Sequence, residues 1–151
     1  MANVYEYEVG VNWQGGLNGM GVARGHNMLD AVPLGIPIEF KGTGGGSNPE
    51  ELLTAAIASC YAMTYGVLAE ERGLEVVDLE THAVGEVEGD GERFVYKRIV
   101  VRPRIQLEKG ANEAMVKHAE ELAHSADAEC VVTNAVRATV QVVIEPEIVV
   151  P

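Results

Sequence analysis

The sequence predicts an α+β fold built from antiparallel sheets and two main helices, in a single domain covering residues 1–151. Two observations carry this prediction. Segments with apolar residues at every second position follow one another in pairs, separated by glycine-rich turns. One long segment, 47–72, instead has its apolar residues at helical spacing. Strands grouped as hairpins, and not alternating one for one with helices, favour α+β over a parallel α/β sheet.

The chain begins with a predicted hairpin. Residues 3–12 alternate as a half-buried strand does, and the turn at 15–19 leads into a second strand at about 20–24. Two more short extended pieces are expected at 28–32 and 36–41, interrupted by prolines.

A buried helix is predicted from about Ser47 to Arg72, because its apolar residues lie on nearly all sides. Asn48 suits the N-cap, Pro49 the first helical position and Glu51 the acceptor position of a capping box. Gly73 is a typical C-cap signal.

Two long strands, 74–88 and 92–108, are predicted to form a second hairpin around Gly89-Asp90-Gly91. A second helix fits about 112–126, where one stripe is apolar and the rest charged. The period-two run 136–150 predicts a final strand or pair of strands.

Composition excludes several classes of function. The formal net charge of −12 repels phosphate backbones and anionic membrane surfaces, so neither nucleic acid nor membrane is expected as a partner. We find neither a secretory signal pattern nor a stretch approaching about 18 apolar residues, and we expect a cytoplasmic protein. Two cysteines 70 positions apart suit neither a disulfide framework nor a Cys-x-x-Cys site. They are either inert core residues or a redox pair.

The glycine run at 42–46 does not resemble a phosphate-binding loop, because Glu50 and Glu51 follow in the first helical turn where a Walker-type loop has Lys and Ser or Thr. Cys60 lies about three turns into the helix, so the helix dipole does little for its pKa. A nearby cation would be needed to activate it, and without one Cys60 would stay mostly thiol and inert. The histidines lack metal-ligand spacing, and we expect no metal and no cofactor.

Two segments give the chain a family resemblance. Gly-Ser-Asn-Pro-Glu-Glu-Leu-Leu-Thr-Ala-Ala-Ile-Ala-Ser-Cys, ending at Cys60, and Glu-Cys-Val-Val-Thr-Asn-Ala, around Cys130, resemble the two motifs of the OsmC/Ohr family of thiol peroxidases. Val131 stands where that family usually has proline, and Thr133 where it has serine.

The resemblance implies an intertwined homodimer with active sites at the interface. It also implies that Cys60 is the peroxidatic cysteine, Cys130 the resolving cysteine and Glu50 the active-site carboxylate. The family's usual arginine after Gly-Gly is replaced here by Leu17, and Arg24 is the nearest arginine. Either Arg24 serves instead, or another arginine does, or the thiolate is less activated and activity is low. Since Glu50 and Cys60 are about 15 Å apart on a continuous helix, either the helix is broken between them or Glu50 acts on the partner's Cys60.

The predicted reaction is reduction of an organic hydroperoxide to an alcohol. Cys60 would become a sulfenic acid and then a disulfide with Cys130, which an external dithiol, for example a lipoyl protein, would reduce. Two alternatives stay open: a non-catalytic ligand-binding or structural dimer, and a hot-dog-type thioesterase that uses Glu50 or Glu51 and no cysteine.

Overall fold

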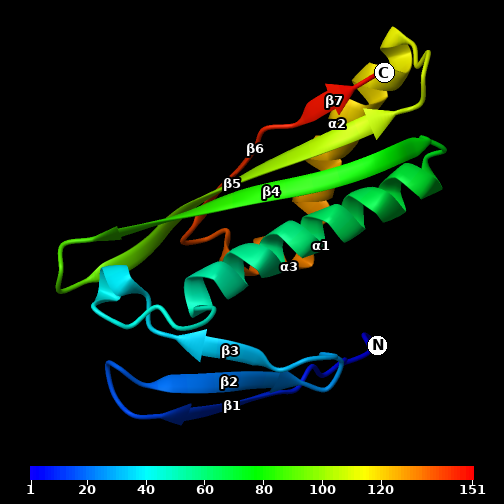
Figure 1. Cartoon of the computed structure of the whole chain (residues 1–151). Coiled ribbons are helices and arrows are strands. Elements are labelled where there is room, and N and C mark those ends of the chain that lie inside the picture. The colour runs from blue at the N-terminus through cyan, green and yellow to red at the C-terminus, as the bar shows by residue number, and fades with distance from the viewer. The chain divides into compact units, whose positions relative to one another are not determined.

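The structure is a computed structural model that describes all residues, 1–151. The fold divides into two compact units, 1–52 and 53–151, which are described separately below (Figure 1).

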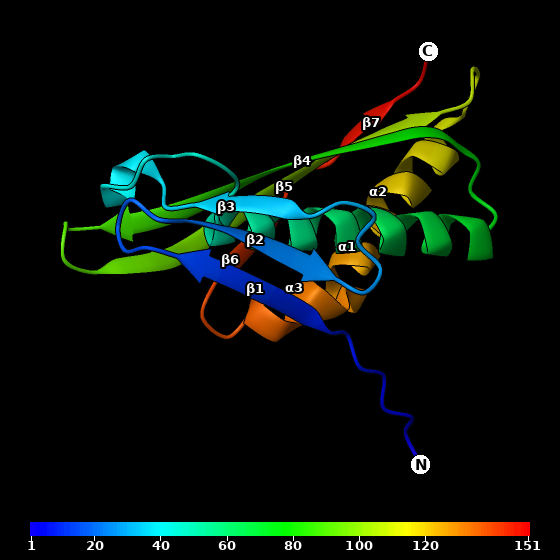
Figure 2. The same cartoon turned by 60° about the horizontal axis from the view of Figure 1, so that its bottom comes forward.

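The N-terminal unit contains a three-stranded antiparallel sheet in the order β1-β2-β3 (Figure 2). The strands are β1 (Val9–Gln14), β2 (Met20–Gly25) and β3 (Val32–Gly35). The predicted β1–β2 hairpin is confirmed, although β1 begins at Val9 and not at residue 3.

The two extended pieces expected next are largely wrong. Residues 28–31 lie outside any strand, and β3 follows them with Pro33 inside it. Proline is tolerated there because β3 is an edge strand of the sheet; on its outer side Ser47 bonds to Pro33 and Gly35. The segment expected to be extended at 36–41 contains a 3-10 helix, η1 (Ile38–Phe40), which Pro37 begins as its N-cap residue.

The long helix α1 (Pro49–Glu71) is confirmed together with its caps, but its expected burial on most sides is wrong, since only 28% of its apolar 18-residue window is buried and Met63 and Val67 are exposed. Asn48 Oδ1 accepts a hydrogen bond from the Glu51 amide at 2.9 Å. At the other end Gly73 has φ +67°, and the amide of the next residue, Leu74, bonds to the Ala69 carbonyl at 2.9 Å. This is a Schellman ending, which requires the left-handed conformation that glycine adopts without strain.

The second sheet is built on the long hairpin of β4 (Val76–Gly89) and β5 (Phe94–Leu107). The turn is held by Asp90, whose Oδ1 accepts hydrogen bonds from two following amides. After the helices the chain returns as β6 (Gln141–Ile144) and β7 (Glu147–Val149), both parallel to β5. The expectation of purely antiparallel pairing is therefore wrong here, because a helical crossover after β5 brings the chain back in the same direction.

One face of β5 forms the core with the helices α1 and α2 (Glu113–Glu129); in Figure 1, α1 runs alongside the hairpin and α2 passes behind it. Alternate residues of β5 are fully buried on this face: Ile99, Val101, Ile105 and Leu107. Three of the four buried residues of α2 are alanines, Ala119, Ala123 and Ala126. Tyr61 and Tyr65 of α1 donate their hydroxyls to the Ala123 and Ala119 carbonyls of α2, at 2.9 and 3.2 Å. These bonds fix α1 along α2.

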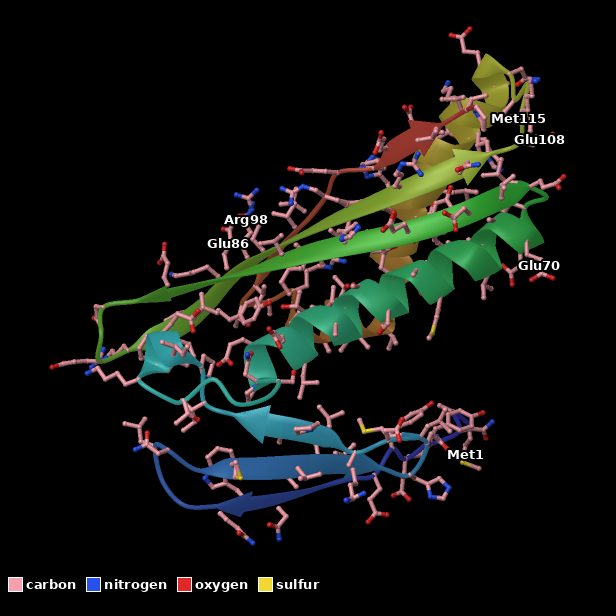
Figure 3. All side chains as sticks on the ribbon, in the orientation of Figure 1. Met1, Glu70, Glu86, Arg98, Glu108 and Met115 are labelled. Atoms are coloured by element: carbon pink, nitrogen blue, oxygen red, sulfur yellow. The ribbon has the colours of Figure 1, made fainter.

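The opposite face of the hairpin is mostly polar, apart from the paired Val84 and Val100. Glu86 on β4 lies beside Arg98 on β5 as a cross-strand pair (Figure 3). Next to this pair the register of the two strands shifts by one residue, which is a β-bulge. The bulge turns Tyr96 toward α1, where the Tyr96 hydroxyl shares a hydrogen bond with the Thr54 hydroxyl. Gly85 lies directly under that bond.

A short helix, α3 (Val131–Val136), follows α2 directly and was not predicted. The last strands begin only at Gln141, because residues 136–140 still belong to the end of α3 and its turn. The Val140 amide, for example, bonds to the Val136 carbonyl at 3.0 Å.

By length and composition alone, α1 could cross a membrane, since an 18-residue window has a mean hydropathy of 1.6. The expectation that no segment approaches this threshold is therefore wrong. Core helices can meet the same criterion, and the buried tyrosines that bond to α2 show that one side of α1 packs in the core.

Candidate active site

The two cysteines, 70 positions apart in sequence, lie together in the C-terminal unit. Cys60 is in the middle of α1 and partly exposed, whereas Cys130 lies between α2 and α3 and is 0% exposed. Both are free thiols, and the Cys130 side chain is hydrogen-bonded to Cys60. The sequence left open whether the cysteines are inert or a redox pair; the structure places them side by side, and a redox role stays a prediction.

A set of hydrogen bonds holds the turn that carries Cys130. Arg137, just after α3, donates through Nη2 to the Asp127 carbonyl at 2.9 Å and to its carboxylate at 3.0 Å. The same guanidinium donates through Nε to Asn134 Oδ1 at 3.0 Å, and Asn134 in turn donates to the Ala128 carbonyl at 2.9 Å. The junction of α2 and α3 is therefore fixed from both sides of Cys130.

Hydrogen bonds lower the pKa of Cys60. Burial of the thiol acts in the opposite direction and raises the pKa, but the hydrogen bonds outweigh it. In decreasing order of effect, the lowering groups are the Cys130 side chain, the Val132 amide, the Thr64 side chain and the Val131 amide. All four groups are neutral, so hydrogen-bond donors provide at least part of the activation that the sequence led us to expect from a cation.

Burial raises the pKa of Cys130, and the neighbouring Cys60 adds to this, while bonds from the Thr133 side chain and amide act in the opposite direction. The Thr133 hydroxyl donates to Cys130 Sγ at 3.1 Å and is itself buried. The pair is thus unequal: Cys60 is partly exposed and has a lowered thiol pKa, whereas Cys130 is enclosed and has a raised thiol pKa.

The other two predicted site residues are not part of this cluster. Glu50 lies in the first turn of α1, and α1 continues unbroken from Glu50 to Cys60, so the broken-helix alternative is wrong. Arg24 is exposed on β2 of the N-terminal unit, opposite Gly10. Its part in activating Cys60 stays a prediction.

The sequence analysis missed the residues that contact the sulfurs. Thr64 is four residues after Cys60, which places it on the same face of a helix, so this neighbour could have been found from spacing. Thr133 was noticed only as a departure from the family motif. The positions of the Val131 and Val132 amides depend on α3, which the sequence did not predict. Of the apolar residues that neighbour Cys60 in sequence, Ile57 and Tyr61 are fully buried in the core and Met63 is exposed.

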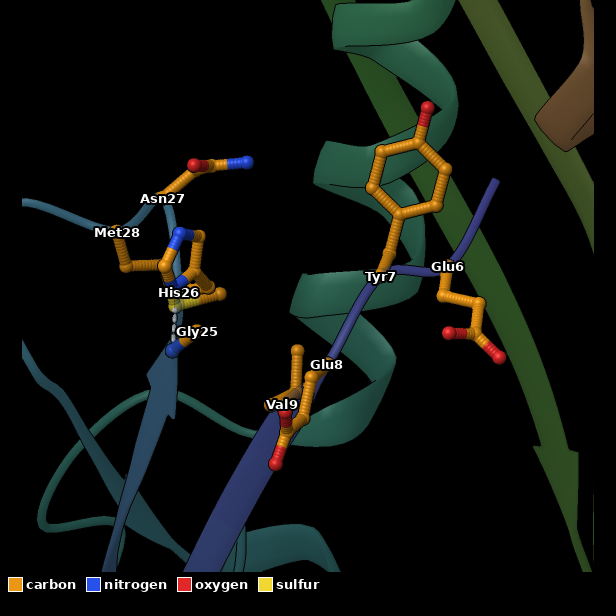
Figure 4. Close-up of a pocket in the computed structure, with 8 residues that line it drawn as sticks. All are labelled: Glu6, Tyr7, Glu8, Val9, Gly25, His26, Asn27 and Met28. Carbon is orange, nitrogen blue, oxygen red and sulfur yellow. Dashed lines mark hydrogen bonds between the residues drawn. The ribbon is translucent and has the colours of Figure 1, made fainter. Parts of the chain in front are cut away.

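No group of three or more His, Cys, Asp or Glu side chains is arranged to hold a metal ion. The N-terminal unit has a separate pocket of about 410 Å³, lined by residues 6–9 and 25–28 (Figure 4). Glu6, Glu8 and His26 line it without a cysteine, so it lacks the chemistry of the Cys60 site.

The protein is a small α+β protein in which two free thiols lie together, and comparison with known proteins gives the family. A family model described as OsmC-like protein matches residues 42–145, and the chain belongs to this family.

Among curated relatives, the uncharacterized protein YmaD of Bacillus subtilis is 31% identical over 144 residues, 95% of each chain. Peroxiredoxin OsmC of Escherichia coli is 28% identical over 98 residues, which are 64% of this chain and 68% of the relative. Among solved structures, the organic hydroperoxide resistance protein OsmC of Legionella pneumophila has a TM-score of 0.76 at 24% identity, covering 97% of this chain and 99% of that one. This structural similarity confirms the predicted fold class.

Proposed function

We propose that this protein is a cysteine-based peroxidase that reduces organic hydroperoxides to alcohols. The observation that carries the proposal is the unequal pair: a partly exposed Cys60 with a lowered pKa, in hydrogen-bond contact with a fully buried Cys130. A peroxidatic cysteine needs access to substrate and thiolate character, while a resolving cysteine needs only proximity. The relatives called peroxiredoxin and organic hydroperoxide resistance protein support the same reaction.

The first step forms a sulfenic acid. The Cys60 thiolate attacks the distal oxygen of the hydroperoxide, the O–O bond breaks, and the alkoxide leaves as the alcohol after taking up a proton. Cys130 is the nearest thiol to supply that proton, because it is hydrogen-bonded to Cys60 and has a raised pKa.

The second step forms the disulfide. The Cys130 thiolate attacks the sulfenic sulfur of Cys60, the S–O bond breaks, and hydroxide leaves as water after taking up a proton from solvent. The two cysteines together therefore supply both electrons that reduce the peroxide. An external dithiol then reduces the disulfide through a mixed disulfide, and a lipoyl protein is one candidate of this chemical class. This cycle suits the reducing cytoplasm that the sequence analysis expected.

We further propose a homodimer in which Glu50 acts on the partner's Cys60. One face of α1 is exposed although it is apolar or small, with Met63 at 71% and Val67 at 54% exposure and with Ala55, Ser59 and Gly66 beside them. Small side chains let a second helix approach closely, and contact with a second copy would bury this apolar face. Within one chain, Glu50 is about 15 Å along the helix axis from Cys60.

Thiol titration tests the peroxidase. After one equivalent of cumene hydroperoxide, both thiols should disappear together, and cumyl alcohol should appear in equal amount. If both thiols stay titratable in excess hydroperoxide, the proposal is wrong.

Mixed dimers test the role of Glu50. A co-purified dimer of one Glu50→Ala chain and one Cys60→Ser chain should retain one active site, because the intact Glu50 and the intact Cys60 then come from different chains. A mixed dimer without any activity would exclude the arrangement across two chains.

A further inference from the structure

We propose that the reductant attacks the sulfur of Cys60 in the Cys60–Cys130 disulfide, and that Thr133 assists this step by donating a hydrogen bond to the departing Cys130 sulfur. The inference rests on the proposed function, since it concerns the recycling of the same pair. It assigns a positioning role to Thr133 and identifies the sulfur through which the reductant binds.

Burial decides which sulfur can be attacked. Cys130 is 0% exposed and enclosed between the end of α2 and the start of α3, and the Arg137 bonds to Asp127 and Asn134 keep that junction closed. Cys60, on α1, is partly exposed. Thiol–disulfide exchange requires direct contact between the incoming thiolate and the sulfur that it attacks. A dithiol therefore reaches Cys60 without any opening of the fold.

The thiol pKa values taken alone would favour attack on Cys130. A sulfur whose thiol has the lower pKa leaves faster, and between these two the thiol with the lower pKa is Cys60. Attack on Cys130 would therefore release the better leaving group, but it would require α2 and α3 to separate first. Because only Cys60 is accessible, the reductant attacks Cys60 despite this preference. The consequence is that Cys130, the poorer leaving group, has to depart.

Thr133 makes Cys130 a better leaving group. Its hydroxyl donates to Cys130 Sγ at 3.1 Å, its amide also bonds to this sulfur, and its side chain is only 1% exposed. At a buried sulfur, water cannot stabilise the charge that develops as the S–S bond breaks. Donors fixed in place by α3 stabilise that charge without reorganisation.

The step balances as follows. The reductant thiolate forms a bond to Cys60 Sγ, the bond from Cys60 to Cys130 breaks, and its electron pair goes to Cys130 Sγ, next to the Thr133 hydroxyl. The second thiolate of the dithiol then attacks the reductant's own sulfur in the mixed disulfide. This releases the Cys60 thiolate and the oxidised, cyclic reductant.

The first experiment locates the mixed disulfide. Diamide oxidises the protein without any peroxide, a short pulse of glutathione follows, and acid stops the exchange before peptide mapping by mass spectrometry. Glutathione should be found on Cys60, with Cys130 as a free thiol. Glutathione on Cys130, or a failure of diamide to join the two thiols, would overturn the proposal. Because no peroxide is used, this result is independent of the peroxidase activity.

The second experiment tests Thr133. Reduction of the diamide-oxidised protein by dithiothreitol should be about ten-fold slower in Thr133→Val, the effect of losing one hydrogen bond to a charged sulfur. Thr133→Ser should restore the rate, since it keeps the hydroxyl. Thr139→Val is the matched control, because the Thr139 hydroxyl bonds to the Val136 carbonyl and not to a sulfur. Equal rates in Thr133→Val and wild type would refute the role of Thr133. If Thr133→Val fails to fold, Thr133→Ala takes its place, with the same expected loss.

Discussion

Replacing Thr64 by valine should make Cys60 less reactive, because it removes one of the four hydrogen bonds that lower the pKa of this thiol. Valine has nearly the same shape as threonine, so the helix and its packing are retained and only the donor is lost. The rate of alkylation by iodoacetamide at about pH 7 follows the thiolate fraction of Cys60. Cys130 contributes little, because it is buried and its pKa is raised.

The size of the effect follows from the site. A hydrogen bond to a charged group contributes about 1.5 kcal/mol, which is roughly ten-fold in thiolate fraction. Cys60 is partly exposed, so water replaces part of the lost bond and the expected decrease in alkylation rate is about three- to ten-fold. Thr64→Ser should keep the wild-type rate. Ser59→Ala is the matched control, because its hydroxyl bonds to the Ala56 carbonyl. An unchanged rate in Thr64→Val would refute activation by neutral donors.

Two further predictions concern the core. The pKa of Tyr65 is raised by burial to about 12 and that of Tyr61 further, by burial and by its neighbours Tyr65, Asp127 and Cys130. Because the folded pKa values exceed the unfolded value of 10.0, the free energy of unfolding should be at its full value below about pH 10 and should decrease as the pH rises toward 12. Urea unfolding of wild type and Tyr65→Phe over this pH range tests the prediction. An equal decrease in both proteins would contradict it. Gly85→Ala should destabilise the protein by about 1–3 kcal/mol, since a Cβ there would collide with the Tyr96 hydroxyl and Thr54 Oγ1. Gly16→Ala, with open space around it, is the control in the same unfolding assay, and equal stability of the two variants would contradict the packing at Gly85.

Local signals explain what the sequence predicted well. The limits of α1 were predicted because Asn48, Pro49 and Gly73 act on their immediate neighbours, and the β4–β5 hairpin because its turn residues are adjacent in sequence. The cysteines themselves were identified from the family motifs around Cys60 and Cys130.

Features that depend on distant contacts were missed. The parallel pairing of β6 and β7 with β5 is set by the path of the chain through α2 and α3, which alternation of apolar residues does not reveal. The short helix α3 consists largely of β-branched residues with low helix propensity, and the Arg137–Asp127 bonds support its end. Because the sequence did not predict α3, it could not predict the Val131 and Val132 amides that bond to Cys60 or the Thr133 bond to Cys130.

The central claim is that Cys60 is oxidised by peroxide and resolved by Cys130, and trapping the intermediate tests it most directly. Wild type and Cys130→Ser are each treated with one equivalent of cumene hydroperoxide in the presence of dimedone, which reacts with sulfenic acids, and are then mapped by mass spectrometry. We predict a Cys60–Cys130 disulfide in wild type and a dimedone adduct on Cys60 in Cys130→Ser. Unmodified Cys60 in both proteins, with the hydroperoxide unconsumed, would contradict the account.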